Sequence, residues 1–364
     1  MPLKGIEIFS GVGGMSLGFK HAGIAPQLAV ELEQIHVDTY NENFAGDHAI
    51  CADARKVSGQ SLLENADIKK GELDVLFGGP PCQGFSLVGK RDPKDPRNDL
   101  TLQFARLVEE LKPRYFVIEN VQGLLSGPGE DIVKAVKTRL KRAKYTVKDP
   151  IRVLNAADYG VPQDRRRVFI VGHLPEETAP EYPTGSTKEQ KNRVTTRMAI
   201  SDLPDVDKHD SLLETNQFDG KLGPASDYVK SLAAFTAPKK AKFRPHTGFQ
   251  RTVHSKETVT RFSKVEEGAY DSISRFRRLA WGRVSHTLRA GTGADRGSFM
   301  AARPIHPDQP RVVTVREGAR LQSFPDWFKF HETKWHAFRQ IGNSVPPLLA
   351  ATVARHVSDA AKNH

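Results

Sequence analysis

The sequence predicts an α/β protein with a doubly wound, mostly parallel sheet and a second, smaller domain of irregular structure. Two features lead to this prediction. Over residues 1–175, short apolar runs alternate with amphipathic stretches, an order typical of a parallel sheet with helices on both faces. Beyond Gly172 the composition changes. Residues 174–250 are rich in Pro, Thr, Ser, Asp and Lys, and their apolar residues show only weak periodicity.

Short apolar runs in the first half predict the buried strands. They occupy residues 6–9, 28–30, 74–77, 115–118 and 167–171. Near-helical spacing of apolar residues predicts helices over 101–112, which Pro113 closes, and over 131–144.

Organised structure is expected to return from Arg311. The pattern there predicts a strand at 312–315 and helices at 316–322 and 346–361. We therefore divide the chain into a first domain, an irregular second domain and a C-terminal segment that returns to the first domain. Their predicted bounds are 1–176, 205–300 and 301–364.

The net charge is concentrated in one stretch of the chain. The formal charge is +11, and residues 239–303 hold 15 Lys and Arg against 5 Asp and Glu. A solvated basic face without a partner is one interpretation. A polyanion such as nucleic acid is favoured, because clustered cations gain affinity by releasing counterions. Arginines interleaved with aromatics suit phosphate and base contacts, as at Arg275, Arg277, Arg278 and Arg283.

Composition also excludes several classes of protein. Two cysteines, Cys51 and Cys82, cannot form a disulfide framework, which favours a reducing compartment and a cytoplasmic location. No apolar run is long enough for a membrane span, and no Cys/His cluster has the spacing of metal ligands. We expect neither a membrane partner nor a metal.

Residues 78–86 read Gly-Gly-Pro-Pro-Cys-Gln-Gly-Phe-Ser and follow a predicted strand. A thiol on a rigid turn at a strand end is where an α/β enzyme places a nucleophile. A free cysteine taken alone is more often a small buried apolar residue. The surrounding prolines and glycines are poor core formers, so they favour the nucleophile at Cys82. The polar, proline-broken stretch 90–97 that follows predicts a mobile loop.

A glycine-rich loop follows the first predicted strand. Gly11, Gly13 and Gly14 allow a tight turn and close approach to a ligand at a helix N-terminus. The loop alone is a weak signal, since it lacks the third glycine of the dinucleotide-binding pattern. Glu31, near the end of the second predicted strand, could bind ribose hydroxyls, and Asp53, where a further strand could end, could accept from an adenine amino group. Together they favour an adenosine-containing cofactor.

Charged side chains mark two further strand boundaries. Glu119 ends the strand 115–118, where it could transfer a proton, engage a base edge or simply cap a turn. Residues 163–167 precede another strand, and alternation sends Arg165 and Arg167 to the same side. Such a pair could orient a carboxylate and stabilise negative charge, or form an exposed basic turn.

Six motifs in this order resemble those of the DNA (cytosine-5)-methyltransferase family. The resemblance covers residues 4–175 and 284–360, while the lobe between them matches only the position of the family's variable target-recognition domain. The motifs are Phe9-Ser-Gly-Val-Gly-Gly14, Gly79-Pro-Pro-Cys-Gln-Gly-Phe-Ser86, Glu119-Asn-Val121, Gln163-Asp-Arg-Arg-Arg167, Arg316-Glu-Gly-Ala-Arg-Leu-Gln-Ser-Phe-Pro325 and Gln340-Ile-Gly-Asn-Ser-Val-Pro-Pro347.

The resemblance implies a Rossmann-like fold that uses S-adenosylmethionine as methyl donor and releases S-adenosylhomocysteine. The first domain would then bind the cofactor and carry catalysis, and residues 205–300 would recognise the target. The implied cofactor-binding residues are Phe9, Ser10, Gly11, Gly13, Gly14, Glu31, Leu32, Asp53, Ala54, Gly79, Pro81, Asn343, Ser344 and Val345.

The same resemblance assigns catalytic roles. Cys82 matches the nucleophile that adds to C6 of a flipped cytosine, Glu119 the carboxylate that engages the base, and Arg165 and Arg167 the supporting arginines. Arg316, Glu317 and Arg320 would organise the recognition lobe. The residues expected to contact DNA are Gln83, Ser86, Arg275, Arg277, Arg278 and Thr287.

The expected substrate is a short sequence in double-stranded DNA, methylated by a monomer associated with the nucleoid of a prokaryote, with or without a cognate restriction endonuclease. Two alternatives stay open. A tRNA cytosine-5 methyltransferase can share these motifs, but its usual Cys-Phe-Thr motif is absent here. A catalytically silent DNA-binding accessory protein would not need the complete set of catalytic residues. The target sequence is not encoded in any simple pattern.

Overall fold

The computed structural model describes the chain except residues 1, 45–47, 82–98, 239–245, 292–302 and 364. The chain forms two compact units. Unit 1 comprises Met1–Asn155, Arg166–Thr184 and Leu349–His364, and unit 2 comprises Ala156–Arg165 and Gly185–Leu348. The functional division predicted above, at 1–176, 205–300 and 301–364, stays a prediction.

Unit 1 contains an eight-stranded sheet in the order β3-β2-β1-β4-β5-β9-β6, with β7 also paired to β9. The first five strands of this order are parallel, and β9 runs antiparallel to β5. The predicted mostly parallel sheet is confirmed. Its strands are β1 (Leu3–Ile8), β2 (Ile24–Glu31), β3 (His48–Cys51), β4 (Val75–Gly78), β5 (Tyr115–Val121), β6 (Thr146–Val147), β7 (Arg152–Asn155) and β9 (Arg166–His173).

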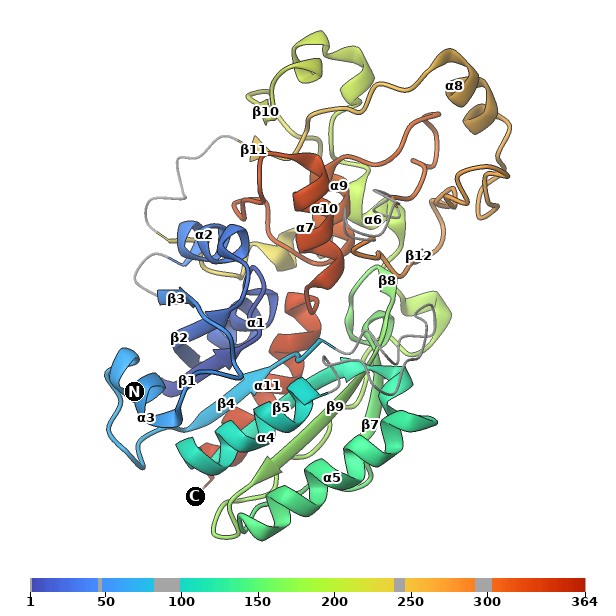
Figure 1. Ribbon diagram of the computed structural model, residues 1–364. Helices are drawn as coiled ribbons and strands as arrows, with labels where there is room; N and C mark the ends of the chain where they lie inside the picture. Colours follow the sequence, from blue (N-terminus) through green and yellow to red (C-terminus); the bar gives the residue numbers. More distant parts are fainter. Residues whose placement is uncertain (1, 45–47, 82–98, 239–245, 292–302, 364) are drawn as a thin grey trace. The chain divides into compact units, whose positions relative to one another are not determined.

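Helices cover both faces of this sheet. Apolar residues of α3, α4 and α5 pack with those of the strands in one core on one face. Figure 1 shows α4 and α5 in front of the strands and α11 behind them. Stacking of Phe19 on Phe77, with ring centroids 4.0 Å apart, joins α1 to β4. The helices are α1 (Gly14–His21), α2 (Gln34–Asn43), α3 (Gly59–Asn65), α4 (Asp99–Leu111), α5 (Pro128–Arg142) and α11 (Pro347–Lys362).

The helices α4, α5 and α11 confirm those predicted in unit 1, although α5 begins three residues earlier than expected. Pro128 occupies the first turn, where its missing N–H is no loss. Glu130 and Asp131 lie in that same turn and complement the positive end of the helix dipole. Among the described residues, no helix is long and apolar enough to cross a lipid bilayer.

Unit 2 is irregular, with short helices and two-stranded pairings. Strand β10 pairs with β11, and β8 pairs in parallel with β12. Short 3-10 turns, such as η5 (Val206–Lys208), connect them. The named elements are β8 (Gln163–Asp164), α6 (Thr196–Ile200), β10 (Gln217–Phe218), α7 (Asp227–Leu232), β11 (His246–Thr247), α8 (Lys256–Ser263), β12 (Ser285–His286), α9 (Val315–Leu321) and α10 (Lys334–Asn343).

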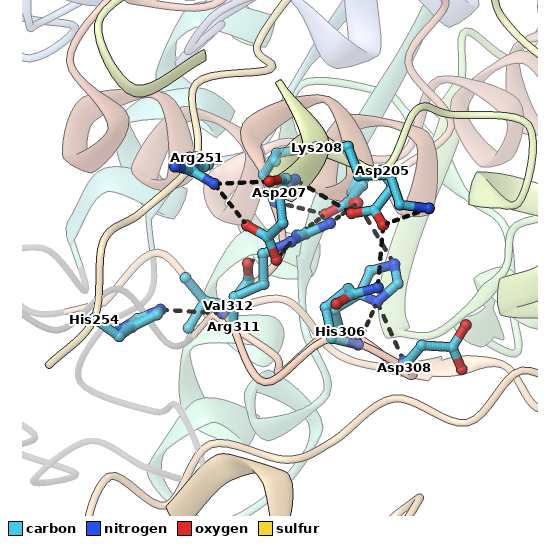
Figure 2. Close-up of polar contacts among 12 residues, drawn as sticks. Asp205, Asp207, Lys208, Arg251, His254, His306, Asp308, Arg311 and Val312 are labelled. Atoms are coloured by element: carbon cyan, nitrogen blue, oxygen red, sulfur yellow. Dashed lines mark hydrogen bonds and ion pairs between the residues drawn. The ribbon is translucent and has the colours of Figure 1, made fainter. Parts of the chain in front are cut away.

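A network of charged side chains organises part of unit 2 (Figure 2). Arg311 donates two hydrogen bonds of 2.9 Å to Glu317 on α9, and its Nε lies 3.6 Å from Asp207. Asp207 also lies 3.5 Å from Arg251. Burial alone would raise the pKa of Glu317, but the charges of Arg311 and His306 and the hydrogen bonds it accepts lower it to about 2. The carboxylate is therefore ionised and links its neighbours.

The predicted strand at 312–315 is wrong. Val312 makes only an isolated bridge with Ile305, and Val315 is already the first residue of α9. Thr314 accepts a hydrogen bond from Glu317 N, and the Glu317 side chain accepts one from Thr314 N. This capping box begins the helix inside an apolar run that resembles a strand. The helix predicted at 316–322 is confirmed by α9.

One buried carboxyl ties three elements of unit 1 together. Glu7 on β1 is 2% exposed and accepts hydrogen bonds from Ser16 N and Ser16 Oγ on α1. Ser16 Oγ in turn accepts one from Tyr40 OH on α2, at 2.8 Å. Burial raises the pKa of Glu7 to about 8, although the hydrogen bonds from Ser16 oppose the shift. The carboxyl is therefore protonated at neutral pH.

This proton makes the stability of unit 1 depend on pH. The unfolded chain releases it near pH 4.5 and the folded chain near pH 8, so folded-state stability falls as pH rises between these values. The variant Glu7→Gln carries a neutral isostere that does not titrate, so its stability should not fall over this pH range. We expect the free energy of unfolding of the wild type to fall relative to the variant by up to about 5 kcal/mol across this window.

Urea denaturation at pH 5 and pH 8 measures this difference. Glu64→Gln replaces an exposed carboxyl of the same unit and serves as the control, with an unchanged pH dependence. Parallel stability curves for the wild type and Glu7→Gln would show that the Glu7 proton is not linked to folding.

Candidate active site

The glycine loop after β1 is tightly packed. Phe9, Gly11 and Gly13 have positive φ angles of 62°, 53° and 88°, so the chain reverses within five residues. A Cβ on Gly13 would lie 2.5 Å from the ring of Phe44 and 2.7 Å from that of Tyr40. Because α2 packs directly on the loop, no side chain fits there. The turn leads into the N-terminus of α1 at Gly14.

Glu31 at the end of β2 is bound to this loop. Its Oε2 accepts a hydrogen bond from Gly11 N at 2.8 Å, and Oε1 accepts one from Glu33 N at 3.1 Å. His36 Nδ1 lies 3.5 Å from Oε1. Burial opposes ionisation, but His36 and the backbone hydrogen bonds lower the pKa of Glu31. An ionised carboxylate, able to accept from ribose hydroxyls, is thus held beside the glycine loop.

Two observations agree with an adenosine-containing cofactor at this edge. Ser10 Oγ is buried and has no hydrogen-bond partner among the described residues. Leu32, directly after Glu31, is 60% exposed and offers an apolar surface beside the carboxylate. A ligand with both polar and flat apolar groups would form a hydrogen bond with Ser10 Oγ and cover Leu32.

Asp53, after β3, has a partner of its own in this structure. Arg55 donates hydrogen bonds to both oxygens, the shortest at 2.7 Å, and these lower the pKa of Asp53. The neighbouring Ala54 is buried, and its carbonyl accepts from Arg106 at 2.8 Å. The predicted cofactor residues from Phe9 to Ala54 therefore lie at the carboxyl ends of β1, β2 and β3 in one sheet. In the described part of the chain no group of metal-binding side chains occurs.

The turn after β4 approaches its neighbours very closely. A Cβ on Gly78 would lie 1.9 Å from Ile8 O, and one on Gly79 would lie 2.9 Å from Glu119 Oε2. Asn120 Nδ2 donates a hydrogen bond to Pro80 O at 3.1 Å. The Glu119 carboxylate and the Asn120 amide therefore both border the backbone that leads through the exposed Pro81 to Cys82. Cys82 itself lies outside the described residues, as do Gln83 and Ser86.

Glu119 and Arg167 form an ion pair at the same edge, with Oε1 and Nε 2.9 Å apart. Strand β9 runs antiparallel to β5, with Val121 opposite Arg167 and Glu119 opposite Phe169. Arg167 is thus the diagonal cross-strand neighbour of Glu119. Both side chains are largely buried, and burial lowers the pKa of Arg167 while Glu119 opposes the shift. The pair fixes the direction of the carboxylate.

Arg165 has different partners from Arg167. Its Nη1 donates to Leu288 O at 3.0 Å, and its Nη2 donates to Gly342 O and Ser344 O, both at 2.9 Å. These contacts lie within unit 2, whereas the Glu119–Arg167 pair lies in unit 1. Arg167 is thus seen paired with Glu119, and a contact of Arg165 with Glu119 stays a prediction. The predicted cofactor contacts of Asn343, Ser344 and Val345 stay a prediction.

A basic pocket of about 360 Å³ lies within unit 2. Thr287 lines it and donates a hydrogen bond to Asp164 O at 2.6 Å. Arg283 and Arg289, which line it as well, are exposed. The lining residues are Asp164, Gln190, Arg193, Thr195, Tyr270, Arg277, Gly282, Arg283, Val284, Ser285, His286, Thr287 and Arg289.

The three arginines predicted to contact DNA differ in their surroundings. Arg275 is exposed, and Arg277 lines the pocket with its guanidinium over the ring of Tyr270. Arg278 is buried and donates to Pro307 O and Phe262 O at 2.7 and 2.6 Å, which favours a structural role. Sequence reasoning did not select Arg289, although it follows Thr287 and Leu288 directly. It also missed Asn120, which stands next to Glu119.

Comparisons with known proteins agree with this geometry. Residues 3–359 match the family model of C-5 cytosine-specific DNA methylase. The chain is 44% identical to the Type II methyltransferase M.XorII of Xanthomonas oryzae pv. oryzae, covering 98% of this chain and 84% of the relative. It is 33% identical to the Type II methyltransferase M1.HphI of Haemophilus parahaemolyticus, covering 98% and 87%.

A solved structure agrees over the full length. A prophage-encoded E. coli protein described as a DNA modification methyltransferase has 32% identity and a TM-score of 0.81, with 100% of both chains covered. The sheet order, the glycine loop and the Glu119–Arg167 pair thus occur in a chain whose relatives modify DNA. The chain belongs to the C-5 cytosine-specific DNA methylase family and is a DNA cytosine-5 methyltransferase of the type II modification class.

Proposed function

We propose that the enzyme transfers a methyl group from S-adenosylmethionine to C5 of a cytosine that is flipped out of a short duplex sequence. A transient bond between Cys82 Sγ and C6 of the base activates the ring. The observation that carries the proposal is the placement of the Glu119–Arg167 pair beside Gly79, where Asn120 also holds Pro80 O. The nucleophile two residues further along would face this carboxylate.

The chemistry requires activation of the ring, because C5 of cytosine is a poor nucleophile. Addition of the Cys82 thiolate to C6 produces an enamine whose electron density lies on C5. A proton or hydrogen bond from the Glu119 carboxyl at N3 lets the ring accept this addition. After methylation, C5 loses its proton and the electron pair of the C5–H bond expels Cys82, which restores the aromatic ring.

Arg167 and Asn120 would act by positioning. Arg167 holds Oε1 of Glu119 and so fixes the direction of the carboxylate that the base would meet. Asn120 fixes the carbonyl of Pro80 and with it the direction of the chain entering Cys82. Such preorganisation lowers the barrier because the groups need not reorganise during the reaction.

The cofactor would be held by unit 1. Its ribose suits the ionised Glu31, its remaining polar groups suit Ser10 Oγ and the glycine-loop amides, and its adenine suits Leu32 and Asp53. When bound, the cofactor supplies an electrophilic methyl group on a sulfonium and leaves as S-adenosylhomocysteine. Gly79, Pro81 and residues 343–345 are proposed to complete the site.

The basic pocket of unit 2 would bind the DNA backbone. Arg283 and Arg289 present exposed guanidinium groups suited to phosphate oxygens, and Thr287, whose hydroxyl donates to Asp164 O, lines the same pocket. The base must leave the stack because C6 is shielded within a duplex. Gln83 and Ser86 are proposed to belong to the loop that closes on flipped DNA. A monomer acting with a cognate restriction endonuclease is the proposed biological setting.

Cys82→Ser is expected to lower methyl transfer by several orders of magnitude, because the hydroxyl is a far weaker nucleophile than the thiolate. Incorporation of tritiated methyl groups into unmethylated plasmid DNA measures the rate, with total tRNA assayed in parallel. Cys51→Ser, which replaces the other cysteine, is the matched control and keeps its activity.

Bisulfite sequencing of the plasmid identifies the methylated position. A duplex carrying 5-fluorocytosine there should form a covalent complex with the wild type, since fluorine cannot leave as a proton does. Full activity of Cys82→Ser would exclude the covalent step. Higher activity on tRNA than on plasmid would exclude duplex DNA as the preferred substrate.

Glu119→Gln should lower the single-turnover rate by about 10² to 10⁴, because the amide cannot supply the proton at N3. Cofactor affinity, measured by calorimetry with S-adenosylhomocysteine, should not change. Glu109→Gln alters a carboxylate paired to Arg139 on the α4 surface and should leave both quantities unchanged. A rate for Glu119→Gln within threefold of the wild type, by rough criterion, would rule out proton transfer by Glu119.

Arg283→Ala and Arg289→Ala should each reduce the slope of log affinity for duplex DNA against log salt concentration by about 1, because one phosphate contact is lost. Fluorescence anisotropy at several salt concentrations measures the slopes. Arg142→Ala removes an exposed arginine at the end of α5 and should leave the slope unchanged. Equal slopes for all variants would place the DNA elsewhere.

A further inference from the structure

Three buried polar side chains of unit 2 form a continuous cluster, which we name the Gln163–Arg165–Gln322 hub. All three are at most 1% exposed. They come from β8, the residue after it, and the end of α9. Buried amides and guanidinium groups are costly unless they are hydrogen-bonded, so the partners of this cluster are well specified.

On one side the hub holds Leu288, the residue directly after Thr287. Leu288 N donates a hydrogen bond to Gln163 Oε1 at 3.0 Å, and Leu288 O accepts one from Arg165 Nη1 at 3.0 Å. Both backbone groups of this residue are thus bound by the hub. Thr287 itself lines the basic pocket and donates to Asp164 O. The position of the Thr287 hydroxyl in the pocket therefore depends on the hub.

On the other side the hub holds the segment that contains Asn343, Ser344 and Val345. Ser344 O accepts hydrogen bonds from Arg165 Nη2 at 2.9 Å and from Gln322 Nε2 at 2.6 Å. Gly342 O accepts another from Arg165 Nη2 at 2.9 Å. A Cβ on Gly342 would lie 2.4 Å from Ala290 N, so the two segments also touch through their backbones.

The two amides of the hub have only one workable orientation. Gln163 Nε2 donates to Gln322 Oε1 at 2.5 Å and to Leu321 O at 3.2 Å. This leaves Gln322 Nε2 as the donor to Ser344 O and Gln163 Oε1 as the acceptor from Leu288 N. A flip of either amide would place like groups against each other. A displacement of Leu288 would therefore strain the hydrogen bonds to Ser344 O, and a displacement of Ser344 would strain those to Leu288.

We propose that the Gln163–Arg165–Gln322 hub couples DNA binding in the basic pocket to cofactor binding at residues 343–345. The proposal rests on the proposed function, which assigns these two ligands to the two segments. A phosphate bound by Arg289, which lines the pocket, also fixes the neighbouring Leu288, and through Arg165 it fixes the carbonyls of Gly342 and Ser344. Because coupling free energies are reciprocal, bound cofactor raises DNA affinity by the same factor.

This assignment gives Arg165 a positioning role. Its Nη1 and Nη2 groups donate to three backbone carbonyls within unit 2. Lysine would keep the charge but cannot hold three carbonyls in the fork geometry of a guanidinium. Arg165→Lys should therefore raise the KM for cofactor and for DNA, with kcat restored when both are saturating. A group acting on the base would instead lower kcat.

Calorimetry with S-adenosylhomocysteine tests the coupling, since this product analogue permits no turnover. Its dissociation constant is measured without DNA and with a saturating duplex that carries the sequence mapped by bisulfite sequencing. We expect the duplex to tighten binding to the wild type by about fivefold or more. In Gln322→Met, which fills the same space without the donor to Ser344 O, the factor should fall below about twofold.

Tyr228→Phe is the matched control. Tyr228 is buried in the same unit and its hydroxyl donates to Arg320 O, outside the hub. This variant should keep the wild-type coupling factor. Thermal unfolding of every variant checks that it is folded at the assay temperature. If Gln322→Met is unfolded there, the coupling factor is measured on Arg165→Lys instead.

The outcomes separate the two proposals. Failure of the wild type to bind S-adenosylhomocysteine or to methylate DNA would overturn the proposed function. If the wild type does both but shows no coupling, or if the folded hub variants keep its coupling factor, the hub proposal is overturned and the proposed function stands. A reduced kcat for Arg165→Lys at saturation would also overturn its positioning role.

Discussion

The reversed direction of β9 is the constraint on which the site depends. Strands β1, β2, β3, β4 and β5 are parallel, so their carboxyl ends meet at one edge. A parallel strand beside β5 would begin at the opposite edge, whereas the antiparallel β9 begins where β5 ends. This brings Arg167, at the start of its strand, onto Glu119 near the end of its own. Without the reversal the carboxylate would lack its cation, and an uncompensated buried charge is strongly destabilising.

The two units differ in how their buried polar groups are hydrogen-bonded. Unit 1 has an extensive apolar core, and its buried polar contacts, such as Glu7 with Ser16, are local. In unit 2 the apolar clusters are small, and buried arginines such as Arg316 and Arg320 bind carbonyls and carboxylates between short segments. A scaffold of this kind needs few long helices or strands. It holds irregular loops in fixed positions, which suits a surface that follows a nucleic acid rather than a small ligand.

Much of the fold was predictable because strands buried on both faces are continuous apolar runs, and a candidate site could be proposed because polar residues follow those runs directly. Glu31 and Glu119 are examples. The failed strand prediction has a physical cause, and two candidate site residues have partners that the sequence does not reveal. The run 312–315 is apolar but precedes a capping box, and tertiary contacts decided its conformation. Arg278 is buried by two carbonyls distant in sequence, and Asp53 pairs with Arg55. The residue type does not predict either partner, because an arginine can donate hydrogen bonds to carbonyls, carboxylates and phosphates alike.

The way the chain enters unit 2 limits how this unit can be exchanged between related chains. Unit 2 is assembled from two separate pieces, Ala156–Arg165 and Gly185–Leu348, with β9 lying between them in the sequence. The first piece is short, yet it supplies β8, and β8 pairs with β12 of the second. A transplant of Gly185–Leu348 alone would leave Gln163 and Arg165 behind, and with them the hydrogen bonds to Leu288 and Ser344. An exchange of this unit between related chains must therefore carry both pieces or match the junction between them.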